Sequence, residues 1–192
     1  MSKRIALLSA VTFSALALTA AIVSPVSAQD KMKSEMSGEK TVMVGGAAMF
    51  PSKNIVQNAV NSKDHTTLVA AVKAAGLVDT LEGKGPFTVF APTNTAFGKL
   101  PAGTVDTLVK PENKATLTKI LTYHVVAGKL EASDLTDGKK LKTVQGEDLT
   151  VKRSGDQIMI IDAKGGSSMI TIKNVNQSNG VIQVVDTVLM PS

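Results

Sequence analysis

The chain of 192 residues contains no cysteine, no tryptophan and only 3% aromatic residues. The absence of cysteine excludes a disulfide framework, a thiolate metal site and a lipidated N-terminal cysteine. The shortage of aromatic side chains argues against base-stacking platforms and against an aromatic cleft for sugars. The stability of the folded chain must therefore come from a packed core.

The charge is too weak and too mixed for a nucleic-acid footprint. The formal net charge is +5, and removing Lys3 and Arg4 at the N-terminus leaves +3. Asp and Glu are scattered along the same segments as Lys and Arg, so no basic stripe forms. We therefore expect no nucleic-acid partner.

The motifs of common enzymes are missing as well. The sequence has no glycine-rich phosphate loop and no Gly-x-Ser-x-Gly elbow, and its only histidines, His65 and His124, lack metal-ligand spacing. His124 could in principle meet Ser133 and Asp134, but nothing marks a strained nucleophile or an oxyanion hole. We expect no catalytic residue, no metal, no cofactor and no enzymatic activity.

Residues 1–28 have the pattern of a secretory signal peptide. Lys3 and Arg4 precede an apolar run from Ile5 to Val23, and Val26-Ser27-Ala28 offers the modest side chains that a signal peptidase needs. A retained membrane anchor is the alternative, but no later stretch approaches the roughly 20 apolar residues of a membrane span. We expect a secreted protein, periplasmic or extracellular, with no transmembrane segment after signal removal.

The rest of the chain predicts a single α+β domain. Residues 29–48 lack apolar periodicity and predict a flexible leader, and residues 49–192 predict the folded domain. Apolar periodicity predicts helices over 51–60, 65–75 and 112–123, with shorter turns at 77–81, 93–97 and 104–109. Short β-prone runs separated by turn signals predict strands at 87–90, 125–126, 129–130, 141–144, 149–152, 158–161, 169–173 and 181–189. Helices first and strands later, without a repeat or linker, indicate one α+β unit.

Three segments resemble the fasciclin (FAS1) family. Residues 87–97, with Leu100-Pro101 after them, resemble its first signature box, and residues 179–189 resemble its second. Residues 121–126 are similar to its Tyr-His element. The resemblance implies two small β-sheets forming a wedge with several α-helices packed around it. It also implies a role in cell adhesion, in matrix contact or in contact between host and microbe.

The resemblance further implies a partner-binding segment at Tyr123 and His124, flanked by Ile120, Leu121, Val125 and Val126. The alternative is structural: Tyr123 ends a helix and His124 begins a strand, so both side chains would be satisfied polar groups that hold the junction. The chain departs from the family at Gln183, where many members have a histidine. A role that needs two histidines is therefore in doubt here.

Two non-catalytic functions follow. The first is an adhesion or interaction module that binds a protein or polysaccharide partner at a cell surface or in a matrix. The second is a periplasmic carrier that holds a small apolar ligand between helices and sheet. An exposed apolar patch near Tyr123 favours the first, and an enclosed apolar pocket with few polar groups favours the second.

Overall fold

The computed structural model describes residues 40–192, so the expected signal peptide and most of the expected leader lie outside the described residues. The described chain opens with a hairpin of β1 (Val42–Val44) and β2 (Ala47–Met49). Val44 and Met49 are buried in the core. The start of the folded domain at residue 49 is therefore corrected, because the hairpin before it already packs against the rest of the domain.

Six short helices follow the sequence pattern closely. They are α2 (Ile55–Ala59), α3 (Thr66–Ala75), α4 (Val78–Glu82), α5 (Asn94–Gly98), α6 (Thr104–Leu108) and α7 (Lys114–Tyr123), with 3-10 turns at Lys63–His65 and Pro111–Asn113. The helix expected from residue 51 begins four residues later, because the Asn54 side chain accepts from the Gln57 amide and caps α2 there. No helix within residues 40–192 is long and apolar enough to cross a membrane.

Asn94 and Gly76 set the ends of α3. The Asn94 side chain accepts from the Thr67 amide at 3.0 Å and donates to the Lys63 carbonyl at 2.8 Å, so it caps a helix distant in sequence. Gly76 ends α3 with φ of 72°, the left-handed conformation that glycine adopts without strain. Thr93, which precedes Asn94, caps α5 as the sequence predicts.

Seven strands form one continuous sheet in the order β4-β3-β9-β8-β7-β6-β5. They are β3 (Phe87–Pro92), β4 (Val125–Ala127), β5 (Lys140–Lys142), β6 (Asp148–Ser154), β7 (Gln157–Ile161), β8 (Ser167–Gln177) and β9 (Gly180–Val185). Strands β5 to β9, in the half of the chain where short strands separated by turns are predicted, form an antiparallel meander, and β3 joins β9 in parallel. The strand expected at residues 129–130 does not form.

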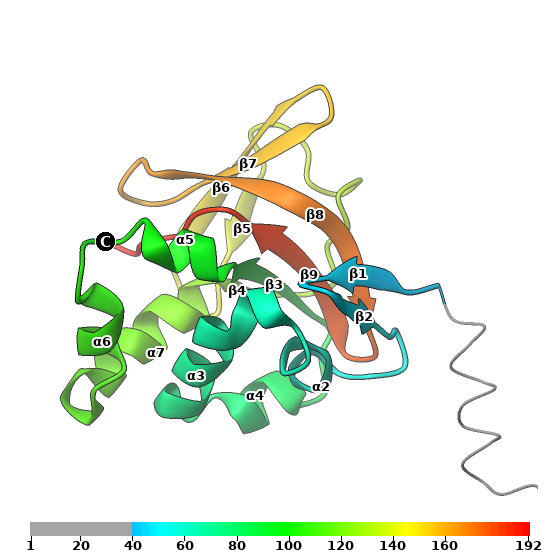
Figure 1. The fold of residues 1–192 in the computed structure, drawn as a ribbon. Coiled ribbons are helices and arrows are strands. Elements are labelled where there is room, and N and C mark those ends of the chain that lie inside the picture. Colours follow the sequence, from blue (N-terminus) through cyan, green and yellow to red (C-terminus); the bar gives the residue numbers. More distant parts are fainter. Residues whose placement is uncertain (1–39) are drawn as a thin grey trace, which may run out of the picture.

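The sheet bends along β8, and its two halves bury different cores. Register shifts interrupt the pairing of β8 with β9, and a bridge between Val126 and Thr143 brings the outermost strands together. The two small sheets implied by the family resemblance are therefore halves of one sheet that share β8. One core lies between helices and sheet around Val89 and Ile182, and the other lies within the bend around Phe90. Figure 1 shows the helices gathered on one side of the strands.

Candidate functional site

The six residues of the predicted partner-binding segment lie in the interior. Their exposed fractions do not exceed 7%, and the residues are Ile120, Leu121, Tyr123, His124, Val125 and Val126. Tyr123 is the last residue of α7, His124 caps that helix, and Val125 opens β4. Helix and strand therefore meet at this pair, where the sequence placed the junction.

The hydroxyl of Tyr123 connects the first residue of β6 to the turn that follows β7. It accepts from the Ala163 amide at 2.8 Å and donates to the Asp148 carbonyl at 3.4 Å. The ring itself is fully buried in the core within the bend. Burial raises the pKa of the Tyr123 phenol, so the hydroxyl keeps its proton at neutral pH.

Both ring nitrogens of His124 bond to the backbone. Nε2 accepts from the Leu189 amide at 3.0 Å, so Nδ1 carries the proton and donates to the Ile120 carbonyl at 2.9 Å. Burial lowers the pKa of His124 to about 4, and the weaker effects of the Ile120 carbonyl and Asp162 oppose it. With both nitrogens occupied, the imidazole is not available as a base for Ser133.

The geometry of the pair supports the structural alternative. Each polar atom of Tyr123 and His124 has a backbone partner, and neither ring reaches the surface. A partner could touch these side chains only if α7 and β4 separated from the sheet. Partner contact by the six residues stays a prediction.

Gln183 replaces the family histidine with a group that supports a kink in β8. Its Oε1 accepts from the Asn174 amide at 3.0 Å, and its Nε2 donates to the Leu130 carbonyl at 3.1 Å. Asn174 is the one non-glycine residue with positive φ among residues 40–192. The amide of Gln183 therefore stabilises an unusual backbone conformation inside the sheet.

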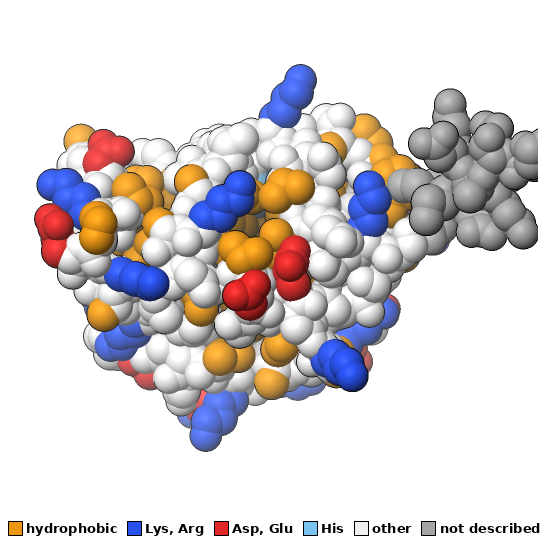
Figure 2. Space-filling model, turned by 90° about the horizontal axis from the view of Figure 1, so that it is seen from below, with side chains coloured by type: hydrophobic (Ala, Val, Ile, Leu, Met, Phe, Trp, Pro, Cys, Tyr) orange, Lys and Arg blue, Asp and Glu red, His pale blue; other side chains and the backbone are white. Residues whose placement is uncertain are grey.

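An apolar pocket lies between the sheet and helices α2, α3 and α4. Its volume is about 50 Å³, and its floor includes Val89 and Ile182 of the central strands. Figure 2 shows hydrophobic side chains gathered around a hollow on the helix-covered side of the molecule. The second function, binding of a small apolar ligand, stays a prediction, and nothing in the sequence pattern located this pocket.

His65 lies in the wall of this pocket. It is only 3% exposed, and its Nδ1 shares a hydrogen bond of 2.9 Å with the Ser62 hydroxyl. Its Nε2 is buried and has no hydrogen-bond partner among the described residues. Burial lowers the pKa of His65, although the nearby Ala91 carbonyl and Asp64 favour the protonated ring. The ring is therefore neutral at pH 7.

The outer face of strands β6, β7 and β8 carries apolar and basic side chains together. Lys152 pairs with Met159, and Met159 pairs with Met169, so the three stand in one row across the strands. Met169 is 37% exposed, which is unusual for a large apolar side chain. Asp186 accepts from the Met169 amide and binds Lys99 at 3.3 Å, so the row continues to a second lysine. We call Lys152, Met159, Met169 and Lys99 the outer row.

Residues 40–192 offer no candidate metal site. No group of three His, Asp or Glu residues there could hold a metal ion. The features that stand out are therefore a buried junction, an apolar pocket and the outer row.

Comparisons with known proteins agree on one family. The family model of the Fasciclin domain matches residues 63–191. Protein sll1483 of Synechocystis is 46% identical over 153 residues, which are 80% of this chain and 82% of that protein. The immunogenic protein MPB70 of Mycobacterium bovis is 40% identical over 138 residues, covering 69% of this chain and 66% of MPB70.

Two further matches carry informative names. The cell surface glycolipoprotein MPB83 of Mycobacterium bovis is 42% identical over 153 residues, and this chain spans 64% of its length. A FAS1 domain pair from the insect cell adhesion molecule Fasciclin I superimposes with a TM-score of 0.65 at 18% identity, covering 73% of this chain and 52% of that structure. At that identity the likeness concerns the fold alone.

Proposed function

The chain belongs to the fasciclin domain family, and on that premise we propose that it is a non-enzymatic interaction module that binds a partner outside the cytoplasm. The observation that carries the proposal is its similarity to a cell surface glycolipoprotein over most of the domain. The signal-peptide pattern of residues 1–28 supports export. Partner binding at a cell surface or in a matrix needs an accessible surface, which the buried Tyr123-His124 junction does not provide.

The outer row is the contact surface of this proposal. Met159 and Met169 offer flexible apolar side chains that adapt to a partner, and Lys152 and Lys99 stand at the ends of the row. An apolar centre with the ammonium of Lys152 at one end suits a protein that presents an apolar side chain beside a carboxylate, whereas Lys99 at the other end is already paired with Asp186. The absence of aromatic side chains from the row favours a protein over a polysaccharide.

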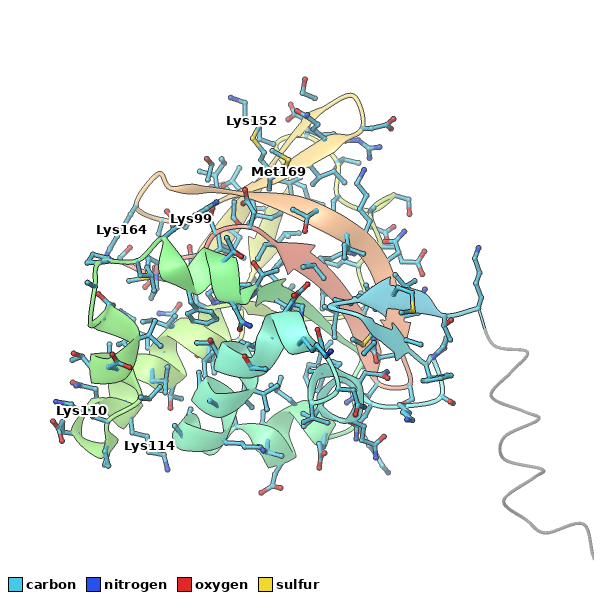
Figure 3. All side chains as sticks on the ribbon, in the orientation of Figure 1. Lys99, Lys110, Lys114, Lys152, Lys164 and Met169 are labelled. Carbon is cyan, nitrogen blue, oxygen red and sulfur yellow. The ribbon has the colours of Figure 1, made fainter. Side chains whose placement is uncertain are left out.

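Charge reversal on this face tests the surface. The double variant Lys152→Glu with Met169→Glu should weaken capture of a partner from the native cell envelope at least about tenfold, since central interface residues dominate binding energy. Lys110→Glu with Lys114→Glu is the control: it lowers the net charge by four, against three for the outer-row pair, and Figure 3 shows Lys110, between α6 and α7, and Lys114, at the start of α7, away from Met169 and Lys152. All four side chains are exposed, so each double variant should unfold within about 1 kcal/mol of the original chain.

Two results would contradict the proposal. If the control pair weakens capture as strongly as the outer-row pair, the effect is one of net charge. The outer row is then not the contact surface. If the original chain retains no envelope component at all, the interaction function itself fails.

The mass of the exported protein tests location separately, because a chain that still carries Lys3 and Arg4 in a membrane fraction would indicate the anchored alternative.

A further inference from the structure

We infer that the pocket between the sheet and helices α2, α3 and α4 binds a small apolar alcohol, whose hydroxyl group bonds to Nε2 of His65. This inference is independent of the proposed interaction function, because the pocket and the outer row are built from different residues. Either could fail while the other stands.

The lining of the pocket favours an uncharged, apolar ligand. All of its lining residues are apolar except His65, Lys73 and His124. Lys73 is exposed and keeps its ammonium group in solvent, while the nitrogens of His124 are already bonded to the backbone. A charged ligand would lose its hydration in the pocket without gaining a counter-charge, so charge is excluded.

His65 supplies the single polar contact. Buried polar atoms in proteins almost always have a hydrogen-bond partner, and an unpaired one costs about 1–3 kcal/mol. Nε2 of His65 has no partner within hydrogen-bond geometry in residues 40–192, although the Ala91 carbonyl lies near enough to the ring to favour its protonation; the ring stands in the wall of an apolar pocket. A ligand that forms a hydrogen bond with Nε2 would remove that cost. The pocket should therefore bind a ligand with one polar group at this position more tightly than a ligand without it.

The neutral ring makes a hydroxyl the matching group. The bond between His65 and Ser62 can form with the proton on either ring nitrogen, so Nε2 is either a donor or an acceptor. A hydroxyl group both donates and accepts, so it complements either tautomer. A carboxylate accepts only and carries charge, and an ammonium group donates only and carries charge.

The volume limits the length of the ligand. A water-sized group needs about 10–15 Å³ by this measure. The pocket volume of about 50 Å³ therefore holds about three to five such groups. Covalently bonded atoms lie closer together than separate water-sized groups, so the six heavy atoms of 1-pentanol, five carbons and one oxygen, are the largest body that we expect to fit without movement of the helices.

The test is an NMR titration of the full chain with 1-pentanol at pH 7. Saturable shifts are expected for the methyl groups of Leu68 and Val72 and for Nε2 of His65. The matched probe n-pentane lacks the hydroxyl and should bind about fivefold more weakly, the value of one hydrogen bond of about 1 kcal/mol. Pentanoate should produce no saturable shift at these groups.

Three variants complete the test. His65→Leu leaves the hydroxyl of bound 1-pentanol without a partner, so the affinity for 1-pentanol should fall below that for n-pentane. Ala59→Leu adds bulk to a pocket-lining residue and should abolish binding of both probes. Val60→Leu is its control, because Val60 is the next residue, is 48% exposed and does not line the pocket.

The original chain alone can overturn the inference, so the result does not depend on the folding of any variant. Shifts at His65 without shifts at Leu68 and Val72 would mean that solvent, not a pocket ligand, satisfies the ring. Equal affinities for 1-pentanol and n-pentane would remove the role of His65. No saturable shift, or equal loss in the Val60→Leu and Ala59→Leu variants, would remove the site.

Discussion

The backbone amide of Leu189 donates to Nε2 of His124 at 3.0 Å, although the two residues stand 65 positions apart. The opposite nitrogen donates to the Ile120 carbonyl of the same helix. The ring therefore joins α7 to the segment that follows β9. Only the neutral ring can make both bonds, because protonation converts the acceptor nitrogen into a second donor.

Acidification should therefore destabilise the protein between pH 6.5 and about 4. The pKa of His124 falls from 6.5 in the unfolded chain to about 4 in the folded one, so the unfolded chain binds more protons in this window. Between pH 7 and pH 4.5 the free energy of unfolding should fall by about 2 kcal/mol from this residue alone. The lowered pKa of His65 acts in the same direction.

Urea unfolding at pH 7, 6, 5 and 4.5 measures this loss. His124→Gln, which does not titrate, should be less stable at pH 7 but should show a flatter profile. A profile for His124→Gln as steep as that of the original chain would mean that other groups carry the pH dependence.

Truncation of Tyr123 and His124 should show whether the pair is a structural junction or a partner-binding surface. Tyr123→Ala should lower the free energy of unfolding by about 3–5 kcal/mol, because it removes a fully buried ring, and the melting temperature should fall by several degrees or more. Tyr123→Phe keeps the ring but leaves the Ala163 amide unpaired, so it should cost about 1–3 kcal/mol. If Tyr123→Ala and His124→Ala instead weaken partner binding at an unchanged melting temperature, the partner-contact prediction holds.

Two glycine substitutions should have opposite effects. A Cβ atom at Gly180 would lie 2.1 Å from the Phe87 carbonyl oxygen, so Gly180→Ala should push β9 from β3 and destabilise strongly. A Cβ atom at Gly98, in α5, meets no atom within 4 Å. Gly98→Ala should therefore raise the free energy of unfolding by about 0.5–1 kcal/mol. Thermal unfolding of both variants measures the contrast, and similar melting temperatures would contradict it.

We expect Asn179 to hold in place helices α2 and α4, which form walls of the pocket. Its Oδ1 accepts from the Ile55 amide at 3.1 Å, and its Nδ2 donates to the carbonyls of Leu81 at 2.7 Å and Gly83 at 3.1 Å. Asn179→Ala removes these bonds between α2, α4 and the β8–β9 turn, and should cost about 2–3 kcal/mol at about 1 kcal/mol per bond.

Asn179→Asp keeps the acceptor for the Ile55 amide but turns a carboxylate oxygen, which cannot donate, toward the Leu81 and Gly83 carbonyls, so it should cost at least as much as Asn179→Ala at neutral pH. Amide hydrogen exchange provides the local measurement, since the amides of α2 and α4 should lose protection before those of β8. Equal loss in both elements would indicate global destabilisation instead.

The sequence predicted most of the local structure, because caps and periodicity are local signals. The cap at Thr93, the end of α3 at Gly76 and the meander of β5 to β9 follow from patterns within a few residues. Placement of β3 beside β9 depends on contacts about 90 residues apart, which no local pattern encodes. The β1–β2 hairpin was not predicted, because Gly45-Gly46 has the composition expected of a flexible leader.

The candidate sites were harder to predict than the fold. The Tyr-His segment was found by resemblance, but burial at a helix–strand junction depends on how the C-terminal segment covers it, and Leu189 lies far along the chain. His65 was visible as one of two histidines, yet only the packing of three helices makes its Nε2 an unpaired atom in a pocket. The outer row was not predicted, although alternation places Met159 and Met169 on the less buried face of their strands, a signal that could have found it.

The central position of β9 has a consequence for the order of biosynthesis. Residues 180–185 are the last strand of the chain, yet they lie between β3 and β8 in the middle of the sheet. Until these residues have been synthesised, β3 has no parallel neighbour. The helices then lack part of the sheet against which they pack. The central sheet of the domain can therefore be completed only after residues 180–185 have been synthesised, so the earlier strands and helices cannot reach their final packing before that point.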